Sequence, residues 1–376
     1  MSSRLFRTAL VAVPLPKPHL IRLRQVFPTL LYRPSQGPDI SSSSSPPHAS
    51  AADWAEADAV LAWSVPAELK HFATQTPRLR LWQLYKAGHS DVVDSEYVRS
   101  IPKGSEVVFS NMSGCAAPNI GEHILGVVLA LTHKIHTSVR IAHAEQRWMA
   151  YDDPLIESFF IRELRTLKVG IIGYGHIGRE TARLFHAHGS PIYALTRSGR
   201  PTPESGYFLP TYGDPSGALP SQWFSSASSS ETDDFLAQCD VVVNTLPASS
   251  ATEGFVGEKV LRAMKGDAIY VNVGRGSTTD HGKLVEALRA TPGEGERRDA
   301  VGTLRIGAAA LDVTAPEPLP PSSPLWTLPN CLITPHISGA TASYYDRAVE
   351  LMLENVRRIE AGEGAWNAFR GRGARE

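Results

Sequence analysis

The stretch KVGIIGYGHIGRETARLF, residues 168–185, constrains the fold more than any other part of the chain. An apolar run leads directly into glycines with GxGxxG spacing, and a helical pattern follows. In such a setting Gly173 permits a tight turn, Gly175 lets the main chain approach a pyrophosphate, and Gly178 allows the helix to pack closely on the strand. The motif predicts a dinucleotide site, with a tight structural turn as the alternative. The residues expected to contact the dinucleotide here are Gly173, Gly175, His176, Ile177 and Gly178.

A second stretch, IYALTRSGR at 192–200, bears on which dinucleotide binds. An acidic residue at the end of this strand would accept both hydroxyls of the adenosine ribose and would repel a 2′-phosphate. The chain has Thr196 at that position, followed by Arg197, Ser198 and Arg200. Because arginines donate charge-assisted hydrogen bonds to phosphate, we expect NADP(H) to be preferred, with NAD(H) still possible. Solvated loop arginines are the alternative.

Short apolar runs alternate with helical patterns along two parts of the chain, which predicts two α/β units with parallel sheets. In the first 115 residues the candidate strands are TALVAVPLP, DAVLAW, LRLWQLY and EVVFSN. Six candidate strands of the second part are LKVGIIG, PIYALT, DVVVNTL, AIYVNVG, IGAAALDV and CLITPH, enough for a complete doubly wound nucleotide domain.

Helical spacing predicts one long helix over 116–148 and a terminal helix over 341–363 that returns to the first domain. Ser, Pro, Gly and charged residues predict loops or insertions at 33–50, 224–234 and 291–302.

The composition points to small-molecule partners. Lys and Arg total 37 against 38 for Asp and Glu, so the charge excess that nucleic acids or anionic membranes attract is absent. The three cysteines lack a CxxC spacing, so neither a disulfide framework nor a metal site is expected, and no apolar run is long enough to span a membrane. We expect a cytoplasmic protein. The acid-poor residues 1–25 leave a mitochondrial transit peptide as the less favoured alternative to a first strand.

Several blocks, in order, resemble the D-isomer-specific 2-hydroxyacid dehydrogenases, a family that includes the glyoxylate/hydroxypyruvate reductases. The blocks are LRLWQLYKAGHSD, VVFSNMSGCAAPNIGEHILGVVLAL, VGIIGYGHIGRETARLF, VVVNTLPASSATEGFVGEKVLRAMKGDAIYVNVGRGSTTDHGKLVEAL, AAALDVTAPEPLP and NCLITPHISGAT. The resemblance implies two doubly wound parallel-sheet domains: a Rossmann domain at 116–338, inserted into a smaller flavodoxin-like substrate domain formed by 1–115 and 339–376. It also implies a homodimer.

By this resemblance three residues form the catalytic group. Arg275 looks like the arginine that binds the 2-oxoacid, and a guanidinium suits the task because its planar fork meets a carboxylate with two parallel bonds. His336 resembles the acid-base histidine. Glu317 resembles the carboxylate that orients the imidazole and favours its charged form. The alternatives are a surface arginine, a solvated turn and a structural histidine.

The resemblance extends to weaker matches. Ala87 and Gly88 match a loop whose amides hold the substrate carboxylate, although the family's acid comes one residue earlier than Asp91. Asp312 resembles the acceptor for the nicotinamide carboxamide. Strand-end turns that would line the cofactor are Leu246, Pro247, Val273 and Gly274. Trp148 corresponds to an aromatic that some relatives insert into the partner's active site, with a plain core or interface tryptophan as the alternative.

The expected function is therefore an NADP(H)-dependent oxidoreductase that reduces a 2-oxoacid, such as glyoxylate, hydroxypyruvate or a bulkier one, to the D-2-hydroxyacid. A dinucleotide-sensing, corepressor-like binding protein on the same fold is the alternative, because such relatives keep the same catalytic residues.

Overall fold

A computed structural model describes residues 5–35, 48–153, 160–290 and 299–369. The chain forms two compact units: unit 1 contains residues 1–116 and 341–376, and unit 2 contains residues 117–340. The expected boundaries at 116 and 338 lie within two residues of these limits.

Unit 2 is built on a seven-stranded sheet in the order β12-β11-β10-β9-β6-β7-β8, and all of its ladders are parallel. This order reverses between β6 and β9, as in doubly wound nucleotide-binding sheets. The strands are β6 (Val169–Ile172), β7 (Ile192–Thr196), β8 (Gln222–Ser225), β9 (Val241–Asn244), β10 (Ile269–Asn272), β11 (Ala308–Leu311) and β12 (Cys331–Ile333). The six expected strands are present; β8 was missed because a short strand in a serine-rich stretch carries little pattern.

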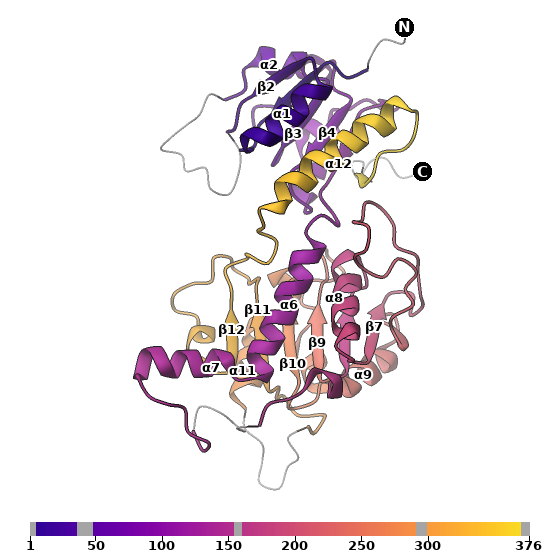
Figure 1. Ribbon diagram of the computed structural model, residues 1–376. Helices are drawn as coiled ribbons and strands as arrows, with labels where there is room; N and C mark the ends of the chain where they lie inside the picture. The colour runs from indigo at the N-terminus through magenta and orange to yellow at the C-terminus, as the bar shows by residue number, and fades with distance from the viewer. Residues whose placement is uncertain (1–4, 36–47, 154–159, 291–298, 370–376) are drawn as a thin grey trace. The chain divides into compact units, whose positions relative to one another are not determined.

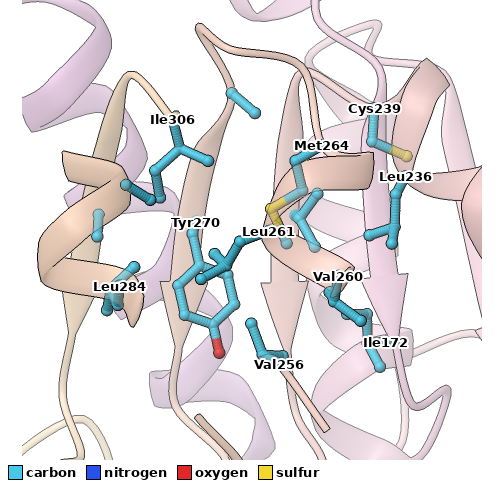
Figure 2. Packing of buried hydrophobic residues seen from close by; sticks show 14 of the residues in the cluster. Ile172, Leu236, Cys239, Val256, Val260, Leu261, Met264, Tyr270, Leu284 and Ile306 are labelled. Atoms are coloured by element: carbon cyan, nitrogen blue, oxygen red, sulfur yellow. The ribbon is translucent and has the colours of Figure 1, made fainter. Parts of the chain in front are cut away.

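Helices cover both faces of this sheet, as the predicted fold class requires (Figure 1). They are α6 (Ala117–Thr132), α7 (Ile135–Arg140), α8 (His176–Ala187), α9 (Ser229–Gln238), α10 (Glu258–Ala263) and α11 (His281–Arg289). Short helical turns occupy Ile141–Glu145, Leu164–Thr166, Gly276–Thr278 and Pro324–Thr327. Figure 2 shows the core on one side of the sheet, where Tyr270 of β10 and Ile172 of β6 lie among Val260, Leu261 and Met264.

The prediction of a single long helix over 116–148 is wrong. It breaks after Thr132, where Lys134 adopts a left-handed conformation with φ 59°, and α7 then turns away from α6 (Figure 1). The His136 ring stabilises the break, because its two nitrogens lie 3.0 and 3.1 Å from the carbonyl oxygens of Ala130 and Pro329. Periodicity alone could not show this break, because no proline or glycine marks it.

The prediction of a loop over 224–234 is also wrong. Residues 222–225 form β8 and α9 begins at Ser229. Ser228 caps this helix by accepting a hydrogen bond from the Glu231 amide, and Phe235 is buried in the core. The serines that suggested a loop therefore include a helix cap. The other predicted insertions, 33–50 and 291–302, lie partly outside the described residues.

Unit 1 contains a six-stranded sheet in the order β13-β5-β4-β3-β1-β2, parallel except for β13. Apart from β13, this is the flavodoxin-like order, so the expected fold class is confirmed. The strands are β1 (Thr8–Val11), β2 (Thr29–Tyr32), β3 (Ala59–Ala62), β4 (Leu81–Leu84), β5 (Val108–Ser110) and β13 (Ala368–Phe369). The helices are α1 (Lys17–Val26), α2 (Ala51–Glu56), α3 (Phe72–Gln75), α4 (Ser90–Val93), α5 (Glu96–Arg99) and α12 (Ser343–Glu360).

Two apolar clusters cover the two faces of the unit 1 sheet, because side chains alternate along each buried strand. Leu10 and Val60 belong to one cluster, whereas Val11 and Leu61 belong to the other. The predicted terminal helix is α12, and Val349, Met352 and Val356 of this helix complete the second cluster. Residues 8–11 are thus a buried strand, as the favoured interpretation of the amino end expected.

None of the helices in the described ranges is both long and apolar enough to cross a membrane alone. The α6 helix and residues 135–145 reach that length and composition only together, across a 71° bend.

Candidate active site

The predicted site residues of unit 2 gather at one edge of its sheet. All seven strands run parallel, so their carboxyl ends meet at the same edge, where doubly wound folds bind their ligands. In strand order this edge carries Thr196 (β7), Gly173 (after β6), Leu246 (after β9), Arg275 (after β10), Asp312 (after β11) and His336 (after β12). With strands spaced about 4.8 Å apart, the ends that lead to Arg275 and His336 are separated by roughly 10 Å.

The turn from β6 into α8 fits a dinucleotide. Gly173 has φ +88°, a conformation that other residues rarely adopt. Gly175 is exposed, and a Cβ built on it would meet no atom within 4 Å, so the main chain there is open to a ligand. Among the described residues no side chain caps α8, which leaves its first amides to an anion such as a pyrophosphate.

His176 begins α8 beside a carboxylate. Its Nε2 lies 3.8 Å from Oε1 of Glu204, whose side chain is only 4% exposed. Burial raises the pKa of the Glu204 carboxyl and lowers the pKa of the His176 imidazole. Both shifts favour the neutral forms, so this acid repels a nearby phosphate less than an exposed carboxylate would.

The turn that follows β7 presents two cations. Arg197 and Arg200 are exposed, and neither guanidinium forms an ion pair with any described residue. The Thr196 hydroxyl accepts a hydrogen bond from the Gly199 amide at 3.1 Å, and Ser225 donates to the Arg197 carbonyl at 3.0 Å. The backbone of the turn is therefore held while both arginine side chains remain available.

Two buried asparagines, which the sequence reasoning missed, shape the turns after β9 and β10. The Asn244 side chain accepts a hydrogen bond from the Leu246 amide at 3.0 Å. Asn272 accepts one from the Gly274 amide at 3.0 Å and donates to the Arg275 carbonyl at 3.1 Å. They occupy paired positions on adjacent strands, so the repeated Val-Asn in VVVNTL and IYVNVG was the available signal.

Arg275 is half-buried and has no carboxylate partner within the described ranges. Its main-chain carbonyl also accepts a hydrogen bond from the Thr278 hydroxyl at 2.6 Å, and its Nη1 donates to the Gly274 carbonyl at 2.7 Å. A positioned guanidinium without an internal counter-ion is what binding of an external carboxylate requires.

His336 and Glu317 are brought together. Nδ1 of His336 lies 2.5 Å from Oε1 of Glu317, and their side chains are 47% and 40% exposed. His336 has φ +53°, an uncommon value for a residue with a side chain, and its amide donates to the Asp312 carbonyl at 2.9 Å. Because Nδ1 is bound to the carboxylate, the expected acid-base role of His336 would fall to Nε2, and it stays a prediction.

Asp312 holds the loop that carries His336. This carboxylate is 3% exposed and accepts hydrogen bonds from the Thr334 hydroxyl at 2.6 Å, the Ile337 amide at 3.0 Å and the Ser338 amide at 3.1 Å. Burial alone would raise the pKa of Asp312, but these hydrogen bonds outweigh it and hold the pKa below its usual value. Its expected contact with the nicotinamide carboxamide stays a prediction.

His123 of α6 is another residue that the sequence reasoning missed. Its Nε2 lies 3.2 Å from the Thr334 hydroxyl and 3.8 Å from Asp312. The sequence offered no signal for it, because His123 is only one of several polar residues in the first half of α6, beside Asn119 and Glu122.

Ala87 and Gly88 lie in unit 1, in the loop that follows β4. The acid at 91 closes their loop, because Asp91 accepts hydrogen bonds from Lys86 and from Ser64, each at 2.7 Å. Their role in binding the substrate carboxylate stays a prediction.

Residues 125–338, more than half of the chain, match the family model described as D-isomer specific 2-hydroxyacid dehydrogenase, NAD binding domain. The chain belongs to this family. It is 27% identical to a glyoxylate reductase of Aeropyrum pernix over 92% of this chain and 94% of the relative. A solved family member from Aeromonas salmonicida superposes with a TM-score of 0.70 at 25% identity, covering 96% of this chain and 98% of that one.

A second dehydrogenase structure, from Xanthobacter autotrophicus in complex with NADPH and MES, gives a TM-score of 0.68 at 25% identity over 97% of this chain and 98% of that one. Membership of the family makes this chain an NAD(P)-dependent D-2-hydroxyacid dehydrogenase with a small-molecule substrate.

Proposed function

We propose that this dehydrogenase uses NADP(H) to reduce a 2-oxoacid, such as glyoxylate, hydroxypyruvate or a bulkier one, to the D-2-hydroxyacid. One observation carries the proposal: a histidine bonded to a carboxylate through Nδ1 shares the sheet edge with an arginine that has no counter-ion among the residues that the structure describes. A 2-oxoacid needs these two groups, a cation for its carboxylate and a proton donor for its ketone oxygen.

The roles of the three side chains follow from their chemistry. Arg275 binds the substrate carboxylate with its planar fork and polarises the adjacent ketone. Bound NADPH supplies the hydride. As negative charge develops on the ketone oxygen, the His336 imidazolium delivers a proton from Nε2, and Glu317 stabilises the charged ring through Nδ1. In the reverse direction neutral His336 accepts the proton.

The turn after β7 supports the proposed preference for NADP(H) over NAD(H). Thr196 lacks the negative charge that would repel a 2′-phosphate, and Arg197 and Arg200 offer exposed guanidinium groups beside it. The NADPH complex of the Xanthobacter relative is consistent with this choice. NADH remains usable, because the pyrophosphate contacts at Gly173 to Gly178 are common to both coenzymes.

We also propose a cytoplasmic homodimer. All three cysteines of the chain are free, as suits a reducing compartment. Large apolar side chains are exposed along α7 and the segment after it, with Trp148 94% exposed, which excludes a core role for this tryptophan. Such a surface favours association with a second copy. The exposed residues are Ile135, Val139, Trp148, Tyr151, Phe160 and Ile161.

The test is a screen of 2-oxoacids with NADPH and NADH in parallel, followed by chiral analysis of the product. We expect oxidation of NADPH with at least one of glyoxylate, hydroxypyruvate or a bulkier 2-oxoacid, and a D-configured product where the carbon is chiral. A tenfold or larger preference for NADH would refute the coenzyme assignment, and an L-configured product would refute the stereochemical one.

A further inference from the structure

The segment between β7 and β8, residues 201–219, is held against α8 by a buried arginine. Arg179 is 3% exposed, and its Nη1 and Nη2 donate to the carbonyl oxygens of Asp214 and Thr202, each at 2.6 Å. A buried guanidinium must be hydrogen-bonded, and here its partners are main-chain oxygens near both ends of the same segment. Arg179 therefore fixes the path of the 201–219 segment.

Tyr174, the residue between the first two glycines of the motif, holds the same segment. Its hydroxyl donates to Oδ2 of Asp214 at 2.8 Å, and Arg179 lies 5.1 Å from its ring centroid. The Asp214 carboxylate also accepts hydrogen bonds from the amides of Ala218 and Leu219, both at 3.0 Å. All of these contacts lie within unit 2, and both Tyr174 and Asp214 are buried.

This segment begins directly after the turn that carries the two cations. Thr202 lies two residues beyond Arg200 in the chain, so the Arg179 hydrogen bond fixes the far end of that turn. The near end is fixed by Thr196 and Ser225 through the Gly199 amide and the Arg197 carbonyl. The exposed arginine side chains thus extend from a backbone that is held at both ends.

We propose that Arg179 and Tyr174 are positioning residues for recognition of the 2′-phosphate: through the 201–219 segment they hold the turn from which Arg197 and Arg200 reach that phosphate. The inference rests on the proposed preference for NADP(H). Arg197 and Arg200 contact the phosphate, whereas the buried Arg179 and Tyr174 fix the position of those two arginines. Neither buried side chain is itself required to touch the coenzyme.

The test compares dissociation constants for NADPH and NADH, measured by quenching of protein fluorescence, in wild type, Tyr174→Phe and Arg179→Met. In each variant we expect the constant for NADPH to rise about tenfold, as when one charge-assisted hydrogen bond to the phosphate is lost, and that for NADH to change less than about twofold. Arg179→Lys, which can still donate to one carbonyl, should lie between wild type and Arg179→Met. Arg262→Met is the matched control, because Arg262 is an exposed arginine paired with Glu258 on α10.

If the two residues have a merely structural role, the variants should bind both coenzymes more weakly by the same factor, or bind both as the wild type does. Either result would overturn the inference, even if the wild type itself prefers NADPH. If the wild type itself binds NADH as tightly as NADPH, the proposed coenzyme preference fails and this inference fails with it.

Discussion

Replacing Asp312 with asparagine tests whether the His336 loop is held in place by a buried carboxylate. An asparagine keeps the shape and one acceptor oxygen, but its amide nitrogen cannot accept the hydrogen bonds that the second oxygen now receives. With the amide oxygen facing Thr334 and Ile337, the Ser338 amide loses its partner. One hydrogen bond to an ionised, buried acceptor contributes about 1.5–3 kcal/mol.

The lost hydrogen bond is one of those that hold the His336 loop in an unfavourable backbone conformation. His336 has φ +53°, and left-handed backbone costs a residue with a Cβ about 1–2 kcal/mol. When the anchor weakens by a comparable amount, the loop relaxes and His336 occupies its position less often. We expect kcat to fall at least about tenfold and at most about 150-fold, the rate equivalents of 1.5 and 3 kcal/mol. The same loss should lower the melting temperature of unit 2 by about 3–12 °C.

The assay needs a variant that loses similar stability elsewhere. Asp58→Asn is the matched control: Asp58 is 4% exposed and accepts hydrogen bonds from the amides of Arg7 and Thr8 in unit 1, each at 2.8 Å. We expect both variants to melt earlier and only Asp312→Asn to lose turnover, measured at a temperature where both are folded. Equal kcat values in the two variants would show that Asp312 serves stability alone.

Acid unfolding supplies a second readout for Asp312. Its pKa is depressed in the folded state, so its contribution to stability is present above the unfolded-state pKa and is lost as the pH falls through the folded-state pKa. The difference in free energy of unfolding between wild type and Asp312→Asn should therefore shrink once the pH falls past about 3.9. A difference that grows in acid would contradict this reasoning.

Three further substitutions test the assigned roles. Arg275→Lys exchanges a bidentate contact for a point charge and should lower kcat/KM for the 2-oxoacid by about 10- to 150-fold; unchanged steady-state kinetics would remove Arg275 from the substrate site. Thr196→Asp should raise KM for NADPH and lower KM for NADH, whereas the uncharged Thr196→Asn should do neither. The same KM changes in both variants would show that the charge at position 196 does not decide between the coenzymes. Glu317→Gln should lower kcat by about 1.4-fold to fivefold, because a half-exposed pair with His336 contributes only about 0.2–1 kcal/mol; a loss beyond a hundredfold would mean that Glu317 does more than stabilise the ring.

Long-range features of the fold were readable from the sequence because buried parallel strands are nearly continuous apolar runs. DVVVNTL and AIYVNVG, for example, lie side by side as β9 and β10. Short edge strands such as β2 and β8 were missed, since they are partly exposed and carry no such run. The break after Thr132 was missed because its cause, the contact of His136 with Pro329, joins residues 193 positions apart.

For the site, motifs indicated the side chains that reach toward ligands but not the groups that hold them. Arg275 and His336 follow their strands in recognisable sequences, whereas Asn272 and Asp312 act through hydrogen bonds to main-chain atoms that only the folded chain brings near. The hold of Arg179 on Thr202 is of the same kind, because a buried arginine in a helix looks in sequence like an exposed one. Sequence patterns indicate which residues are buried and what chemistry they carry, but they do not show which residues form hydrogen bonds with one another.

The central claim is that the guanidinium of Arg275, the imidazole of His336 and the carboxylate of Glu317 act on one substrate. The most direct measurement is a crystal structure of the wild-type protein with NADPH and oxamate, an unreactive 2-oxoacid analogue. The account predicts the oxamate carboxylate in the fork of Arg275 and its carbonyl oxygen within about 3 Å of Nε2 of His336, with Glu317 still on Nδ1. An oxamate bound away from Arg275, or with no atom near Nε2, would contradict it.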